Sequence, residues 1–93
     1  MEANEAAWLR EIELRLGAKE EGAVDDRVMR LLLRITKVAA DATGVRYLAP
    51  LTAYLVGRAA GRAEAAGERF DLRAVADDIA GLARGWPAPE PRS

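Results

Sequence analysis

The stretch Ala49–Gly61, APLTAYLVGRAAG, decides the fold that this sequence predicts. Pro50 suits the start of a helix. The N–H groups of the first turn have no acceptor within the helix, so the missing N–H of proline costs nothing there, and the φ angle of proline is already helical. A glycine inside a helix costs about 1 kcal/mol relative to alanine, so Gly57 and Gly61 indicate the close approach of another backbone. We therefore predict that this stretch is the central packing helix of an all-α domain.

Helical periodicity continues on both sides of this stretch, and no segment shows the strict alternation that is typical of a strand. Aspartates at positions 25, 26 and 71 can cap helix starts, and Gly17, Gly44 and Gly67 provide helix ends. The predicted helices span residues 4–16, 25–43, 50–66 and 71–85. Because their connections are short, we predict a compact antiparallel bundle of four helices.

The sequence predicts one bundle domain over residues 1–86, followed by a disordered proline-rich tail over residues 87–93. Between the second and third helices, residues 45–48 are expected to be extended, because the position before Pro50 disfavours the α region. The free energy gained by burying the apolar side chains is largely offset by the loss of chain entropy. We therefore expect the domain to be only marginally stable alone. Dimerisation or docking onto a larger protein would stabilise it.

Composition limits the chemistry of this chain of 93 residues. It has no cysteine, which excludes a disulfide framework, a thiolate metal site and a cysteine nucleophile. It has no histidine, the commonest metal ligand and the usual general base near neutral pH. We therefore predict a protein that is not an enzyme and has neither a cofactor nor a metal site. The N-terminal sequence lacks the layout of a signal peptide and no apolar run reaches membrane-spanning length, so we expect a cytoplasmic protein.

The net charge of −1 conceals three blocks of charge. Residues 1–26 contain eight acids and three bases, residues 27–62 one acid and seven bases, and residues 63–93 six acids and four bases. One interpretation is that acidic flanking helices complement a basic middle pair within the fold. The other is that the basic middle faces an anionic ligand or partner.

Arginine and tyrosine side chains gather around the start of the third predicted helix. Arginine forks and tyrosine hydroxyls can hold a phosphate or carboxylate, and the N–H groups of a helix terminus would add to such a site. The candidate residues for an anion site are Arg46, Tyr47, Tyr54, Arg58 and Arg62. The alternative is that these arginines pair with nearby acids and lie along the surface.

The second predicted helix carries a basic stripe of Arg30, Arg34 and Lys37. The chain is net acidic, the stripe has no interleaved aromatic residues, and no nucleic-acid-binding motif accompanies it, so we interpret the stripe as a solvated face. Trp8 and Trp86 stand near opposite ends of the chain. We expect both in the core, with an exposed docking anchor as the alternative.

A set of positions distributed over most of the chain carries a resemblance to a known family. These positions are Trp8-Leu9, Ile12, Leu16-Gly17, Asp26, Leu31, Val38-Ala39, Gly44-Val45, Ala49–Thr52, Leu55–Gly57, Ala59–Gly61, Leu82-Ala83 and Trp86. The chain resembles an actinobacterial-type family of small helical domains of unknown function. Its members occur alone or joined to the C-terminus of proteins similar to molybdenum cofactor guanylyltransferase, which attaches GMP to molybdopterin.

This resemblance implies a context and no activity. Family members often carry a histidine near the end of the second helix and an extra Arg-Pro in the connector, whereas this chain has Asp41–Thr43 and Arg46–Leu48 there. Our leading hypothesis is a non-catalytic helical module that binds a protein partner, a molybdenum cofactor nucleotidyltransferase or an associated maturation factor. The alternatives are a domain that binds a small anion, such as a nucleotide or pterin phosphate, and a self-associating homodimeric bundle.

Overall fold

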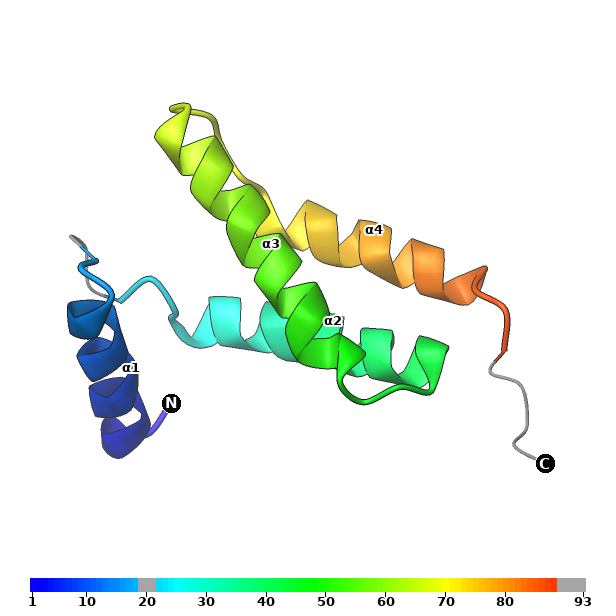
Figure 1. Cartoon of the computed structure of the whole chain (residues 1–93), viewed down its shortest axis with the longest axis horizontal. Coiled ribbons are helices and arrows are strands. Elements are labelled where there is room, and N and C mark those ends of the chain that lie inside the picture. The colour runs from blue at the N-terminus through cyan, green and yellow to red at the C-terminus, as the bar shows by residue number, and fades with distance from the viewer. Residues whose placement is uncertain (19–21, 89–93) are drawn as a thin grey trace. The chain divides into compact units, whose positions relative to one another are not determined.

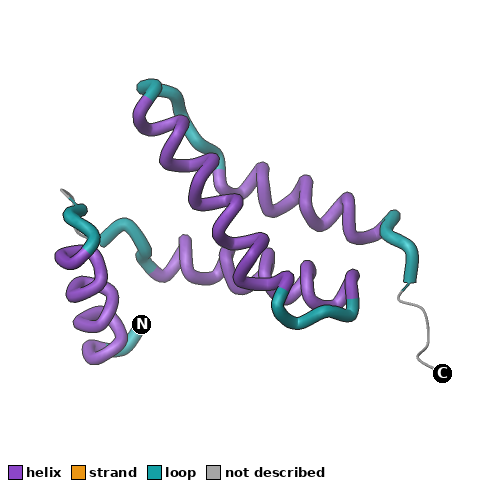
Figure 2. Tube along the Cα trace, viewed as in Figure 1, coloured by secondary structure: helices purple, strands orange, loops and turns teal. Residues whose placement is uncertain are grey.

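The computed structural model describes residues 1–18 and 22–88 of the chain. Within these residues it contains four helices and no strand, so the predicted all-α class is confirmed. The helices are α1 (Ala3–Arg15), α2 (Asp26–Thr43), α3 (Leu48–Ala65) and α4 (Leu72–Arg84) (Figures 1 and 2). Their bounds lie within two residues of the predicted ones. None of the described helices is long and apolar enough to cross a membrane.

The chain divides into two compact units, Met1–Arg30 and Leu31–Ser93. The prediction of a single domain over residues 1–86 stays a prediction. The predicted tail begins with Pro87 and Ala88, which are exposed, and its remaining residues, 89–93, lie outside the described part of the chain.

In the first unit, α1 is held by contacts at its two ends. Its N-cap is Glu2, whereas the predicted helix begins at residue 4, and the backbone N–H of Glu2 donates to the carboxylate of Glu5 at 3.0 Å. Beyond the helix, the two carboxylate oxygens of Glu13 accept the N–H groups of Gly22 and Ala23, each at 3.3 Å. No residue of α1 is buried.

The second unit has a core to which each of its three helices contributes at least one buried residue. Ile35 of α2 is 1% exposed, and it packs with Val56 of α3 and Ala76 of α4. The partly buried side chains around this cluster are Leu31, Leu32, Phe70, Leu72, Val75 and Ile79. The side of α2 that carries Leu31, Leu32 and Ile35 therefore faces the core.

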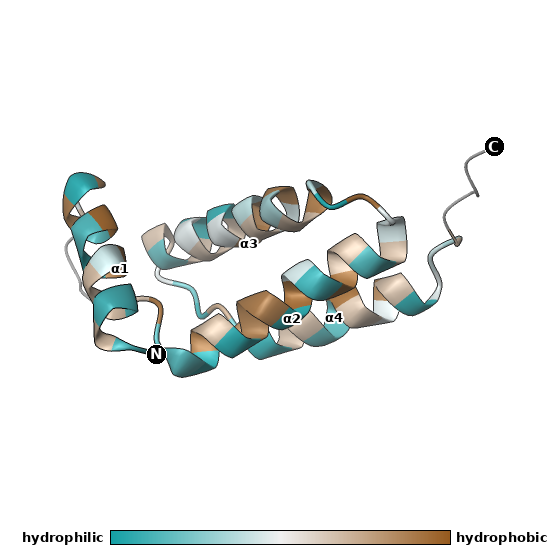
Figure 3. Cartoon of the chain, turned by 90° about the horizontal axis from the view of Figure 1, so that it is seen from below, coloured by the Kyte–Doolittle hydropathy of each residue, from teal (hydrophilic) through white to brown (hydrophobic). Residues whose placement is uncertain are grey.

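Within this unit, α2 and α4 run in the same direction and α3 returns in the opposite sense (Figure 1). Figure 3 shows α2 and α4 side by side, with apolar and polar residues alternating along both ribbons. Successive helices are thus antiparallel in sense, as their short connections predict.

The packing of α3 differs from the prediction. A Cβ atom at Gly57 or Gly61 would meet no other atom within 4 Å, so no backbone approaches these glycines. Val56 is buried, whereas Leu51 and Leu55 are exposed. Two neighbouring stripes of α3 have the spacing of a buried helical face, so the sequence pattern does not decide which of them is buried. The stripe with the smaller side chains, which includes Thr52, Val56 and Ala60, faces the core.

The prediction that residues 45–48 are extended is also wrong. The N–H of Leu48 donates to the carbonyl of Val45 at 3.2 Å, and the N–H of Ala49 donates to the carbonyl of Arg46 at 3.1 Å. These turn hydrogen bonds outweigh the preference of the residue before proline, and α3 begins at Leu48. Pro50 remains within the first turn, where its missing N–H is not needed.

Asp25 and Asp71 cap helix starts in the structure, as predicted. Asp71 accepts the N–H of Ala74 at 3.0 Å, and Asp25 accepts the N–H of Val28 at 2.8 Å. The glycines that end the first three helices, Gly17, Gly44 and Gly67, have φ angles of 72°, 71° and 69°. Because only glycine adopts this left-handed region at little cost, these positions fix the helix ends.

Candidate interaction surface

One side of α3 presents large apolar and basic side chains away from the core. Leu51, Tyr54 and Leu55 are 51%, 63% and 65% exposed, and Arg58 and Arg62 lie among them. We call these five residues the outer face of α3. Spacings of three and four residues place them on neighbouring turns of one helix, so they form a continuous surface.

The arginines in and just before α3 lie in a stretch of the sequence that contains no acidic residue. No acidic residue occurs from Ala42 to Ala63, whereas three arginines do. The guanidinium carbon of Arg58 lies 5.9 Å from the centre of the Tyr54 ring, a cation–π distance. Among the described residues, Arg46, Arg58 and Arg62 form no ion pair. The outer face of α3 therefore carries positive charge that the described fold leaves uncompensated.

The candidate anion-site residues are all exposed, and the structure brings two of them into contact, Tyr54 and Arg58. Arg46 and Tyr47 lie in the turn that precedes α3, where Tyr47 is the N-cap residue. Arg62 lies one turn beyond Arg58. The anion site therefore stays a prediction.

The basic stripe of α2 is largely taken up by ion pairs. Arg34 Nη1 lies 2.8 Å from Asp77 Oδ1 on α4, and Lys37 Nζ lies 2.8 Å from Asp41 Oδ2 on its own helix. The hydrogen bond from Arg34 lowers the pKa of the Asp77 carboxyl, and the hydrogen bond to Asp41 raises the pKa of Lys37. These pairs favour the interpretation of the stripe as a solvated face.

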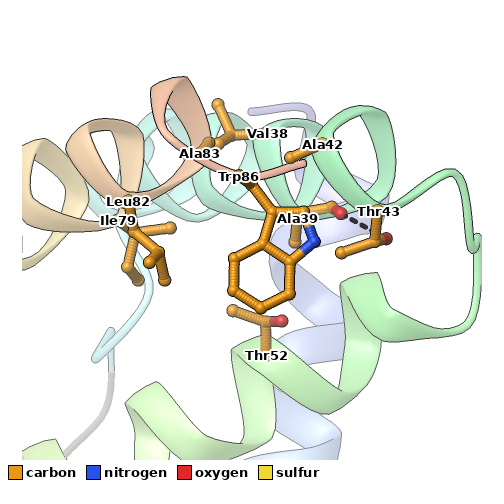
Figure 4. A pocket seen from close by; sticks show the side chains of 9 residues that line it. All are labelled: Val38, Ala39, Ala42, Thr43, Thr52, Ile79, Leu82, Ala83 and Trp86. Atoms are coloured by element: carbon orange, nitrogen blue, oxygen red, sulfur yellow. Dashed lines mark hydrogen bonds between the residues drawn. The ribbon is translucent and has the colours of Figure 1, made fainter. Parts of the chain in front are cut away.

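An apolar pocket of about 160 Å³ lies between the ends of the three helices of the second unit (Figure 4). Its lining residues are Val38, Ala39, Ala42, Thr43, Thr52, Ile79, Leu82, Ala83 and Trp86. Thr43 Oγ1 donates to the carbonyl of Ala39 at 2.7 Å, the dashed line in Figure 4, and Thr52 Oγ1 donates to the carbonyl of Leu48 at 2.6 Å. Since both hydroxyls are bonded to their own helices, the wall of the pocket is almost entirely apolar.

The end of α4 holds Trp86 beside this pocket. The N–H of Gly85 donates to the carbonyl of Leu82, and the N–H of Trp86 donates to the carbonyl of Ala83, both at 3.2 Å. Trp86 is 50% exposed and Trp8, on α1, is also exposed, so the expectation that both belong to the core is wrong. The pocket could not be predicted from residue spacing, because its walls come from three helices.

Several acidic side chains have partners within the described part of the chain. Among residues 1–18 and 22–88, no group of three acidic side chains comes together in a way that could hold a metal ion. The acidic side chains with described partners there, among them Asp41 and Asp77, instead form ion pairs or accept backbone N–H groups.

Comparison with known proteins identifies the family. A family model described as a domain of unknown function (DUF6457) matches residues 2–91. The chain belongs to this family. No curated protein and no solved structure matches the chain. The DUF6457 match agrees with the resemblance to a helical family of unknown function.

Proposed function

We propose that this DUF6457 domain is a non-catalytic helical module that binds a protein partner. The observation that carries the proposal is the outer face of α3, where Leu51, Tyr54 and Leu55 are more than half exposed. Exposed apolar side chains that adjoin one another are typical of sites where proteins dock. Tyrosine and arginine are also enriched at interfaces, and this face combines both.

The charge of this face indicates the kind of partner. Arg58 and Arg62 have no acidic partner among the described residues, and no acid occurs from Ala42 to Ala63. An acidic surface would complement these arginines and would accelerate association. The proposed partner therefore presents carboxylates around an apolar centre.

For the identity of the partner we propose a molybdenum cofactor nucleotidyltransferase or an associated maturation factor. The support is the resemblance of the chain to actinobacterial-type domains that are joined to proteins similar to molybdenum cofactor guanylyltransferase.

Calorimetric titration of the purified chain with the nucleotidyltransferase of the same organism tests this function. We expect saturable binding that a Leu51→Glu, Leu55→Glu variant weakens by at least about tenfold, because it places charge at the apolar centre. The matched control is Leu33→Glu, an exposed leucine on α2, which is expected to leave the affinity unchanged. Absence of binding by the unmodified chain, or equal binding by the double variant, would overturn the proposal.

The alternative is a domain that binds a nucleotide or a pterin phosphate through Arg46, Tyr47, Tyr54, Arg58 and Arg62. It is favoured by the lack of acidic partners of these arginines within the described fold. In a thermal-shift experiment, GMP or a pterin phosphate should raise the unfolding temperature of the chain. The Arg58→Ala, Arg62→Ala variant should lose that rise, and the same rise in both proteins would contradict this alternative.

The self-associating homodimeric bundle predicts a different outcome. Sedimentation at several concentrations would show a mass twice that of the chain, and the outer face of α3 would be the contact between copies. A single species with the mass of one chain at all concentrations would exclude it.

A further inference from the structure

The apolar pocket beside Trp86 is a second feature of the surface that could receive a partner. We propose that it takes one apolar side chain, a leucine, methionine or phenylalanine, from an acidic segment of the partner protein. This inference rests on the proposed function, because it names an anchoring site for the same kind of partner.

The size of the pocket fits a single side chain. Its volume of about 160 Å³ is close to that of an engineered apolar cavity of about 150 Å³ that binds benzene. Leu82 and Trp86 line it and are 61% and 50% exposed, so the pocket is open to a ligand from outside. A side chain that enters would gain contact with the apolar walls and would cover these two exposed side chains as well.

The chemistry of the walls selects an apolar group. The hydroxyls of Thr43 and Thr52 donate to carbonyl oxygens of their own helices, at 2.7 Å and 2.6 Å. A polar group in the pocket would lose its hydrogen bonds to water and find few replacements, whereas an apolar group would lose nothing. A small number of large apolar anchors, each in its own pocket, is the usual basis of affinity at protein interfaces.

The surroundings of the pocket select an acidic segment. An adjoining hollow shares Val38, Ala42 and Ala83 with the pocket and is lined by one acidic and one basic residue, Asp41 and Arg84. Asp41 is already paired with Lys37 at 2.8 Å, whereas Arg84 forms no ion pair within the described residues.

The turn between α2 and α3 and the end of α4 each carry a further group that adds to this preference. Arg46 lies in the turn between the helices that carry Thr43 and Thr52, is exposed, and has no ion pair among the described residues. The indole N–H of Trp86 has no acceptor in the described part of the chain. A carboxylate could accept from an indole N–H and would be attracted by these arginines.

Fluorescence of Trp86 measures occupancy of the pocket in a Trp8→Phe variant of the full chain, in which Trp86 is the remaining tryptophan. The probe is the blocked peptide Glu-Glu-Leu-Glu-Glu, and the controls replace its leucine with alanine or its glutamates with lysines. We expect a saturable change of the emission with the acidic leucine peptide, and binding at least about tenfold weaker with either control. No saturable change, or the same response to all three peptides, would overturn the proposal.

Variants that fill the pocket test whether the peptide binds there. Ala83→Leu adds a side chain inside the pocket, and Ala74→Leu makes the same change at an exposed position of the same helix. The first should weaken binding of the acidic leucine peptide by at least about tenfold, and the second should leave it within about twofold. Circular dichroism checks folding, and Ala42→Leu fills the pocket from α2 should Ala83→Leu fail to fold. Equal binding by the filled variant would overturn the proposal.

The same variants separate this inference from the proposed function. If the nucleotidyltransferase binds and Ala83→Leu leaves its affinity unchanged, the pocket inference is wrong while the interaction function stands. If the transferase does not bind but the acidic leucine peptide saturates the pocket, the proposed partner is wrong and the pocket site stands. If Ala83→Leu dissociates a dimer of the chain in sedimentation, the occupant is a second copy and the proposal of an acidic partner is overturned.

Discussion

Arg34 on α2 and Asp77 on α4 are joined by a hydrogen-bonded ion pair of 2.8 Å between residues 43 positions apart in the sequence. The pair links two helices that run side by side and also contribute Ile35 and Ala76 to the core. The bond from Arg34 lowers the pKa of Asp77. This contact makes the stability of the second unit depend on pH in a way that a single variant can test.

Asp77→Asn is expected to remove a small part of the stability at neutral pH and to change its dependence on acid. A carboxyl whose pKa is lower in the folded state stabilises the fold above its unfolded pKa of about 3.9, and that contribution is lost as the pH falls through the folded value. The unfolding temperature of the variant should therefore lie at most a few degrees below that of the unmodified chain at neutral pH, because both groups are exposed. At the lowest pH values the unfolding temperatures of the variant and the unmodified chain should become equal.

Thermal unfolding followed by circular dichroism over a series of pH values checks this expectation. Asp78→Asn is the matched control, since Asp78 is the next residue on α4 and has no described ion pair with Arg34. A pH dependence that is the same in Asp77→Asn as in the unmodified chain would contradict the role of the pair.

Ile35→Ala is expected to destabilise the second unit strongly. Ile35 is 1% exposed and lies at the centre of the cluster with Val56 and Ala76, so its removal leaves a cavity among three helices. Substitutions of this kind cost about 2–5 kcal/mol. Urea unfolding measures the loss, and Leu33→Ala, an exposed position of the same helix, should stay within about 0.5 kcal/mol of the unmodified chain. Similar losses for both variants would show that Ile35 is not in the core.

Gly57→Ala is expected to stabilise the chain. A Cβ atom at this position would meet nothing within 4 Å, and alanine is favoured over glycine inside a helix by about 0.5–1 kcal/mol. Gly67→Ala is the contrasting change, because its φ angle of 69° is unfavourable for alanine, and it should destabilise. Urea unfolding distinguishes the two. A destabilising Gly57→Ala would restore the original prediction that another backbone packs closely against this glycine.

Asp71→Ala is expected to weaken the start of α4. The side chain of Asp71 accepts the N–H of Ala74 at 3.0 Å, and loss of such a cap typically costs about 1 kcal/mol. Asp78→Ala, a change of the same residue type inside the helix, should have a smaller effect because no cap is lost. A matching loss in both variants, measured by urea unfolding, would count against the capping role.

Local features of the sequence determined the helices and their ends. Asp71 caps and Gly67 ends a helix through contacts with residues a few positions away, so the pattern of residue types is sufficient to place them. The stripe of α2 that contains Ile35 was also predictable, because its apolar residues follow one another at the three- and four-residue spacing of a buried helical face. The candidates for an anion site were likewise chosen by residue type.

Only the tertiary structure decided which side of α3 is buried and where a pocket forms. Apolar residues occur on more than one side of that helix, so its spacing allowed either Leu51 and Leu55 or Thr52 and Val56 to face the core. The choice depends on contacts with α2 and α4, which lie far away in the sequence. The same is true of Trp86, whose place beside the pocket follows from how three helix ends meet. Helical spacing is a local property, whereas burial is set by the partners that a face meets in the folded chain.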